Sequence, residues 1–106
     1  MLESKFQSQV IKKIKSSMPD ALIFKMDPNY IQGTPDLLIL NDGQWAALEC
    51  KASKNAKHQP NQEFYVDKMN GMSFARFIFP ENEEEVLNEL QQALQPRRKT
   101  RISGAK

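Results

Sequence analysis

Apolar side chains recur with the spacing of one helix face near both ends of this chain. The first such pattern comprises Leu2, Phe6, Val10, Ile11 and Ile14. Spacings of three and four residues predict an amphipathic helix, which should end near Pro19 because proline cannot continue a helix. The second pattern comprises Val86, Leu87, Leu90 and Leu94. It predicts a last helix that begins with the capping pair Asn82 and Glu85 and stops at Pro96.

Between these helices, four short runs rich in apolar residues have the length of β-strands. They cover residues 21–26, 36–40, 44–52 and 73–79. The second run is apolar on both faces and is expected to lie inside the sheet. The Asn-Asp-Gly sequence at residues 41–43 tolerates positive φ angles and predicts a hairpin turn. A further helix is expected from Pro60 to about Asn70, with Gly71 as its C-terminal cap.

The elements follow one another in the order α-β-β-β-α-β-α, which indicates an α/β fold. No internal repeat or linker divides this order, so residues 1–96 are expected to form a single domain and residues 97–106 a basic flexible tail. The tail carries five positive charges and no acid, whereas residues 1–96 contain ten Lys and Arg and thirteen Asp and Glu. A basic tail suits a nucleic-acid partner, because cationic side chains displace counterions from phosphates. A solvated terminus without a partner explains the tail equally well.

The composition narrows the class of protein. With 40% hydrophobic and 26% charged residues, the chain is typical of a globular protein. No apolar run approaches the roughly 20 residues that span a bilayer, and no secretory signal is visible near Met1. A cytoplasmic location is therefore expected. Cys50 and His58 are the only residues of their kinds, which excludes an internal disulfide and a cysteine-held zinc site.

Two charged residues of the third strand occupy positions where their neighbours predict burial. Side chains alternate across a strand, so Glu49 and Lys51 share one face while Cys50 points to the other. Burying charges costs several kcal/mol unless they are paired or bind a metal. Asp36 stands at the start of the second strand, and the hairpin should bring it beside Glu49 and Lys51.

This grouping predicts a metal-dependent hydrolase of phosphodiesters. Neighbouring carboxylates repel one another unless a cation intervenes, and Mg²⁺ prefers carboxylate and water oxygens, so Asp36 and Glu49 suit it. Lys51 beside such a site can orient a water nucleophile and stabilise charge on a phosphate. The plainer interpretation is an exposed ion pair worth a few tenths of a kcal/mol. That interpretation leaves the Gly-x-Pro before Asp36 and the well-placed turn unexplained.

These residues resemble a known motif. Pro35-Asp36, followed thirteen residues later by Glu49-Cys50-Lys51, is similar to the motif of the PD-(D/E)XK nuclease superfamily. The stretch Gly33–Leu37 and a later helical Gln62 resemble more narrowly its VRR-NUC branch, which is related to Holliday junction resolvases. The likeness covers nearly all of residues 1–95. It implies a restriction-endonuclease-like αβββαβ core, with a mixed central sheet flanked by helices and an added C-terminal helix.

The resemblance also implies roles for single residues. Asp36, Glu49 and the backbone carbonyl of Cys50 would bind Mg²⁺, which Mn²⁺ could replace, and Lys51 would be the catalytic lysine. Glu3, the only acid on the first helix, would be a further metal ligand, although it could equally complement the helix dipole. Gln62 is expected to face the sheet and would contact the lysine or the scissile phosphate. The alternative for Gln62 is an ordinary structural hydrogen bond.

The implied activity is that of a DNA endonuclease selective for branched structures such as four-way junctions. A chain of 12.2 kDa offers little surface, so a homodimer with two active sites is expected. Neither a membrane nor a small-molecule cofactor is expected to take part. Two other classes of function stay open. One is a DNA-binding module on the nuclease fold without catalysis, and the other is an interaction protein that docks a partner through the acidic residues of its last helix.

Overall fold

The computed structural model describes residues 1–95 and shows the expected order of elements. The helices are α1 (Glu3–Ser17), α2 (Gln62–Met72) and α3 (Glu83–Ala93), with a 3₁₀ turn, η1 (Pro80–Asn82), before α3. The strands are β1 (Leu22–Lys25), β2 (Leu37–Asn41), β3 (Gln44–Cys50) and β4 (Phe74–Ile78). The basic tail expected at residues 97–106 lies outside the described residues. No helix of the described part is long and apolar enough to cross a membrane.

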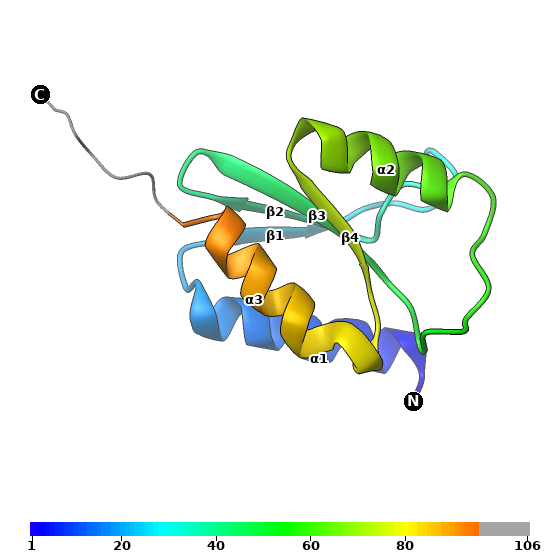
Figure 1. Ribbon diagram of the computed structural model, residues 1–106, viewed down its shortest axis with the longest axis horizontal. Coiled ribbons are helices and arrows are strands. Elements are labelled where there is room, and N and C mark those ends of the chain that lie inside the picture. The colour runs from blue at the N-terminus through cyan, green and yellow to red at the C-terminus, as the bar shows by residue number, and fades with distance from the viewer. Residues whose placement is uncertain (96–106) are drawn as a thin grey trace, which may run out of the picture.

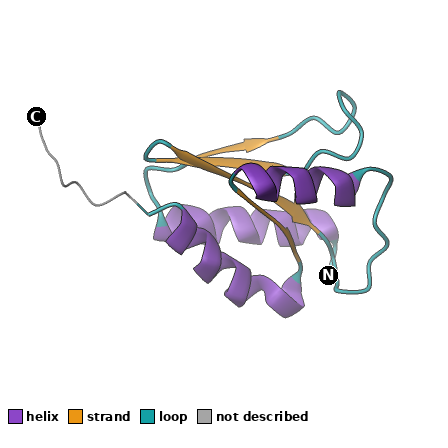
Figure 2. Ribbon diagram, turned by 45° about the horizontal axis from the view of Figure 1, so that its top comes forward, coloured by secondary structure: helices purple, strands orange, loops and turns teal. Residues whose placement is uncertain are grey.

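The four strands form one mixed sheet in the order β1-β2-β3-β4. β1 and β3 are both antiparallel to β2, whereas β4 runs parallel to β3. A parallel pair needs a crossover connection, and α2 provides it (Figure 1). α1 and α3 lie on one side of the sheet and α2 lies on the other (Figure 2). The fold is therefore α/β, with a mixed sheet flanked by helices, as the sequence predicted.

The main core lies between the sheet and the pair formed by α1 and α3. Phe6, Val10 and Ile14 of α1 are each at most 1% exposed, and so is Leu90 of α3. Burial of each such side chain contributes roughly 1.5–3 kcal/mol to stability. The apolar spacing predicted both helix faces correctly except at its first position. Leu2 precedes α1 and is 73% exposed.

The side of the sheet that faces α2 is covered only in part. β2 lies inside the sheet, as predicted, and its Ile39 is buried in the main core. Leu40 on the other face is 37% exposed, although the strand is apolar on both faces. The reason is that α2 packs through Val66 on Ala47 of β3 and Ala75 of β4, one strand further along.

Two predicted helix caps are wrong. Gly71 lies inside α2, which continues to Met72. Asn82 makes no side-chain capping bond to α3. Instead its Oδ1 accepts a hydrogen bond from the Phe79 N–H at 2.8 Å, and its Nδ2 donates to the Phe77 carbonyl at 3.1 Å. Asn82 therefore closes the turn that leads from β4 into α3, a role that its spacing from Glu85 does not reveal.

Two of the acids that suggested a docking helix have partners within the chain. Glu83 is buried, and its Oε1 lies 3.1 Å from the Lys13 Nζ on α1. The Oε1 of Glu89 lies 3.3 Å from the Nε of Arg76 on β4. These contacts join α3 to α1 and to the sheet, which gives both acids a structural role.

Gly33, in the loop between β1 and β2, lies against the start of α2. Its φ is +95°, and an added Cβ would lie 2.6 Å from the Asn61 Cβ and 2.7 Å from the Pro60 carbonyl oxygen. We expect Gly33→Ala to lower the free energy of unfolding by about 2 kcal/mol or more, because it adds a collision to an unfavourable backbone conformation. Urea denaturation measures this loss.

Gly43→Ala is the matched control for this substitution. Gly43 also has a positive φ, +80°, but no atom lies within 4 Å of the added Cβ. Gly43→Ala should therefore lower the free energy of unfolding only by the cost of the unfavourable backbone conformation, about 1–2 kcal/mol. Equal losses in the two variants would contradict the close contact between Gly33 and the start of α2.

Candidate metal centre

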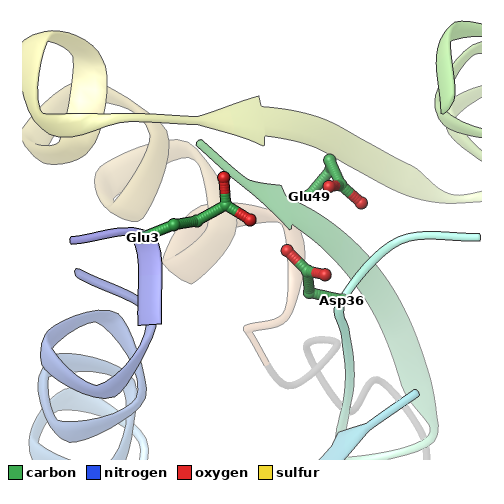
Figure 3. A group of neighbouring side chains, drawn as sticks. All are labelled: Glu3, Asp36 and Glu49. Atoms are coloured by element: carbon green, nitrogen blue, oxygen red, sulfur yellow. The ribbon is translucent and has the colours of Figure 1, made fainter. Parts of the chain in front are cut away.

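Three carboxylates from separate parts of the chain meet at one end of the β2–β3 pair. Glu3 belongs to the first turn of α1, Asp36 directly precedes β2, and Glu49 lies in β3. Each offers one oxygen to a group whose members all lie within 4.8 Å of one another. Figure 3 shows the Glu3 and Asp36 side chains approaching Glu49 from these elements. A Mg²⁺ or Ca²⁺ ion, which binds oxygens at about 2.0–2.6 Å, fits between atoms with such separations.

The hairpin sets the relative position of two of these acids. Leu37 of β2 pairs with Leu48 of β3, so the residue before Leu37 and the residue after Leu48 become neighbours. Asp36 and Glu49 are those residues. The backbone N–H of Cys50 also donates to Asp36 Oδ2 at 2.8 Å, which fixes the carboxylate against the end of β3. The predicted meeting of Asp36 and Glu49 is therefore observed.

Glu49 is the most deeply buried of the three acids, with 1% of its surface exposed. Its Oε2 accepts a hydrogen bond from Gln62 Nε2 at 2.8 Å and lies 4.0 Å from Lys51 Nζ. Its Oε1 is also buried and has no hydrogen-bond partner within residues 1–95. A buried polar atom without a partner costs free energy. A cation bound at Oε1 would remove that cost.

Burial raises the pKa of all three acids. It is the largest cause at Glu49, whose pKa rises to about 8, and the negative charge of Asp36 adds to the effect. The pKa of Asp36 and that of Glu3 are also raised, again mainly by burial. The positive charge of Lys51 acts in the opposite direction on each acid. Full ionisation of the group at neutral pH is thus unfavourable without a further cation.

Lys51 follows the last residue of β3 and is 4% exposed. The predicted strand 44–52 thus ends earlier, although the Lys51 N–H still donates to the Ile78 carbonyl of β4 at 2.9 Å. Its Nζ donates to the Lys57 carbonyl at 3.1 Å. These two bonds hold the backbone and the ammonium group of Lys51 beside Glu49.

Gln62 is the first residue of α2 and faces the sheet, as predicted. Its Oε1 accepts from the Gln59 N–H at 2.8 Å, while its Nε2 donates to Glu49. Gln62 therefore contacts Glu49, whereas the resemblance implied a contact to Lys51 or to a phosphate. Held from both ends, the Gln62 amide orients the Glu49 carboxylate.

Cys50 contributes its backbone, while its thiol lies in the hydrophobic core. The side chain is buried in the core beneath α1 and α3, as the alternation of β3 predicted, and burial raises the pKa of its thiol. The N–H of Cys50 binds Asp36. Metal binding by its carbonyl stays a prediction.

Sequence reasoning missed three groups around these residues. The Lys57 carbonyl and the Gln59 N–H are backbone groups, and no residue type signals such contacts. Gln7 is different, because it lies one helical turn after Glu3 on α1 and so shares its face. Hydrogen bonding by the Gln7 side chain lowers the pKa of Asp36 and partly offsets the effect of burial. The spacing of Glu3 and Gln7 could have revealed this contact.

Comparisons of the chain with models of protein families, with curated proteins and with solved structures find no match. The family likeness therefore rests on the residues quoted above. What the molecule itself shows is an α/β fold with a four-stranded mixed sheet and an acidic cluster that could hold a metal.

Proposed function

We propose that this protein is a metal-dependent endodeoxyribonuclease of the PD-(D/E)XK type, which hydrolyses phosphodiester bonds in DNA. One observation carries the proposal. The buried Glu49 Oε1 has no partner in the described residues, and Glu49 belongs to a group of three carboxylates and has a buried lysine beside it. A structural ion pair has no need of three acids around one lysine, whereas a site for a divalent cation and a phosphate does.

The residues present fit a Mg²⁺ ion. Asp36, Glu49 and Glu3 supply carboxylate oxygens, and the Cys50 carbonyl is the backbone ligand that the PD-(D/E)XK resemblance adds. Oxygen ligands of this kind suit Mg²⁺, and Mn²⁺ accepts the same set. When bound, such an ion lowers the pKa of a water molecule and neutralises charge on a phosphate.

The chain's own groups then have separate tasks. Lys51 presents its ammonium beside Glu49, held by the Lys57 carbonyl, where it would stabilise the charge that builds on the phosphate and orient the attacking water. Gln62 is a positioning residue, because it acts on the reaction through Glu49. Burial of Glu49 and Lys51 keeps bulk water away, which strengthens each of these electrostatic interactions.

Two parts of the proposal rest on the family resemblance. These are a preference for branched DNA such as four-way junctions and action as a homodimer. A cytoplasmic setting, the expectation from the sequence, is a further part of the proposal. A dimer would present two copies of the acidic centre to the two strands of one junction.

A panel of labelled DNA substrates tests the proposal. Duplex, single strand, flap and four-way junction are incubated with wild type and with Asp36→Ala, in Mg²⁺, in Mn²⁺ and in EDTA. We expect wild type to cut at least one substrate with either metal, and no cutting in EDTA or by Asp36→Ala. DNA binding without cutting under any metal would replace this proposal with a non-catalytic DNA-binding module. Neither binding nor cutting would exclude both.

A further inference from the structure

A surface pocket lies on the outer side of the segment that holds Lys51 and Gln62 in place. It is formed by residues 57–61 and by Glu63 and Phe64 in the first turn of α2, and its volume is about 620 Å³, within the range of small-ligand sites. Lys57 and Gln59 are among the residues that line this pocket. The Lys57 carbonyl and the Gln59 N–H meanwhile bind Lys51 and Gln62. The same short segment therefore lines the pocket and contacts residues beside the acidic centre.

Phe64 gives this pocket an aromatic surface that the fold leaves uncovered. Its side chain is 59% exposed, although an aromatic ring of this size is usually buried. The ring meets Tyr65 edge-on, with centroids 5.1 Å apart and planes at 79°. Exposed aromatic rings of this kind are platforms on which unpaired nucleobases stack, with little dependence on sequence.

The charged groups around Phe64 also suit a nucleotide. Glu63, the one acid in the pocket lining, has its Oε2 2.9 Å from His58 Nδ1, so its carboxylate is engaged by the imidazole. His58 in turn stacks on Phe77 of β4, with centroids 4.1 Å apart and planes at 11°, which anchors the segment to the sheet. The Lys57 side chain is exposed and lines the same pocket. A lysine near an aromatic ring is the pairing that binds a backbone phosphate beside a stacked base.

We propose that this pocket takes an unpaired nucleobase of the DNA strand whose phosphodiester lies at the acidic centre. The base stacks on Phe64, and Lys57 contacts the backbone phosphate next to it. This inference rests on the proposed nuclease function. It gives a physical reason why the protein would prefer branched DNA to a continuous duplex. A continuous duplex keeps its bases paired, whereas a flap or a junction can supply an unpaired base without the cost of breaking a pair.

The test measures binding of labelled flap, single-stranded and duplex DNA by fluorescence anisotropy in EDTA, where no strand is cut. We expect Phe64→Leu to weaken binding of the flap and the single strand about tenfold, as loss of one stacked base does, and to leave duplex binding unchanged. Phe64→Trp should restore the affinity. Met72→Ala is the matched control, because Met72 is an exposed apolar residue at the other end of α2.

Each alternative result has its own meaning. Equal flap binding by wild type and Phe64→Leu would overturn the inference, as would equal losses on flap and duplex. If wild type cuts DNA while Phe64→Leu binds normally, the nuclease proposal stands and only the pocket assignment fails. If wild type neither binds nor cuts any DNA, both fail together.

Discussion

Replacing Lys51 with alanine is expected to lower the rate of DNA cleavage by about 10²–10³-fold, the usual effect of removing one preorganised electrostatic donor from a reaction centre. The ammonium of Lys51 is held 3.1 Å from the Lys57 carbonyl and 4.0 Å from Glu49. The ammonium is thus held in place before any substrate binds. Single-turnover cleavage of the preferred substrate in Mg²⁺ measures the rate.

Lys54→Ala is the control for Lys51→Ala. Lys54 is exposed on the same loop, and its backbone N–H contacts Glu81, so its side chain should have little effect on the rate. The substitution leaves Glu49 without the lysine beside it, so the folding of the variant has to be checked. Circular dichroism and thermal unfolding provide this check. A folded Lys51→Ala protein that cuts at the wild-type rate would show that this lysine takes no part in catalysis.

Replacing Glu49 with glutamine is expected to abolish cleavage and, in the absence of metal, to stabilise the protein. The buried Glu49 carboxylate carries a charge that burial disfavours, and one of its oxygens has no hydrogen-bond partner in the described residues. Glutamine keeps the shape and can still accept the bond from Gln62, yet it has no charge to bury. We expect the metal-free variant to gain about 1–3 kcal/mol at pH 8, measured by urea denaturation in EDTA.

Glu85→Gln is the matched control for Glu49→Gln, because Glu85 is exposed on α3 and its substitution should change stability by no more than about 0.5 kcal/mol. If Glu49→Gln were less stable than wild type at pH 8 in EDTA, the burial cost at Glu49 would be refuted. Added Mg²⁺ should stabilise wild type and leave Glu49→Gln unchanged, since the variant lacks a metal ligand.

The pH dependence of stability follows from the same carboxyl group. Folding raises the pKa of Glu49 from 4.5 to about 8, so between these values the folded protein binds more protons than the unfolded chain. The free energy of unfolding in EDTA should therefore fall as the pH rises from about 5 to 8. Glu49→Gln should remove most of this slope. Mg²⁺ should also reduce it in wild type, because the metal replaces the proton.

The sequence was sufficient to predict the order of elements and the meeting of Asp36, Glu49 and Lys51. Both follow from local rules, namely apolar periodicity for the helices and strict alternation along β3. Alternation placed Glu49 and Cys50 on opposite faces, and a short turn after β2 placed Asp36 beside Glu49. The sequence does not reveal which part of the sheet a helix covers. Leu40 is exposed because α2 lies over β3 and β4, and helix placement depends on the whole sheet.

The contacts that hold the site together were harder to predict. The Lys57 carbonyl holds Lys51, and the Gln59 N–H holds Gln62, through backbone groups that every residue type carries. The close approach of Gly33 to Asn61 likewise joins two loops that lie far apart in sequence. Residue types predict where charge is concentrated, whereas the shape of these loops is decided by tertiary packing.

Binding of Mn²⁺ to the protein without DNA, followed by electron paramagnetic resonance or by calorimetry, tests most directly the claim that the three carboxylates form a metal centre. The comparison is between wild type, Asp36→Asn and the control Asp42→Asn, which removes an exposed acid from the β2–β3 turn. We expect saturable binding by wild type and by Asp42→Asn, and an affinity at least about tenfold weaker in Asp36→Asn. Equal Mn²⁺ affinity in wild type and Asp36→Asn would contradict the metal centre at these residues.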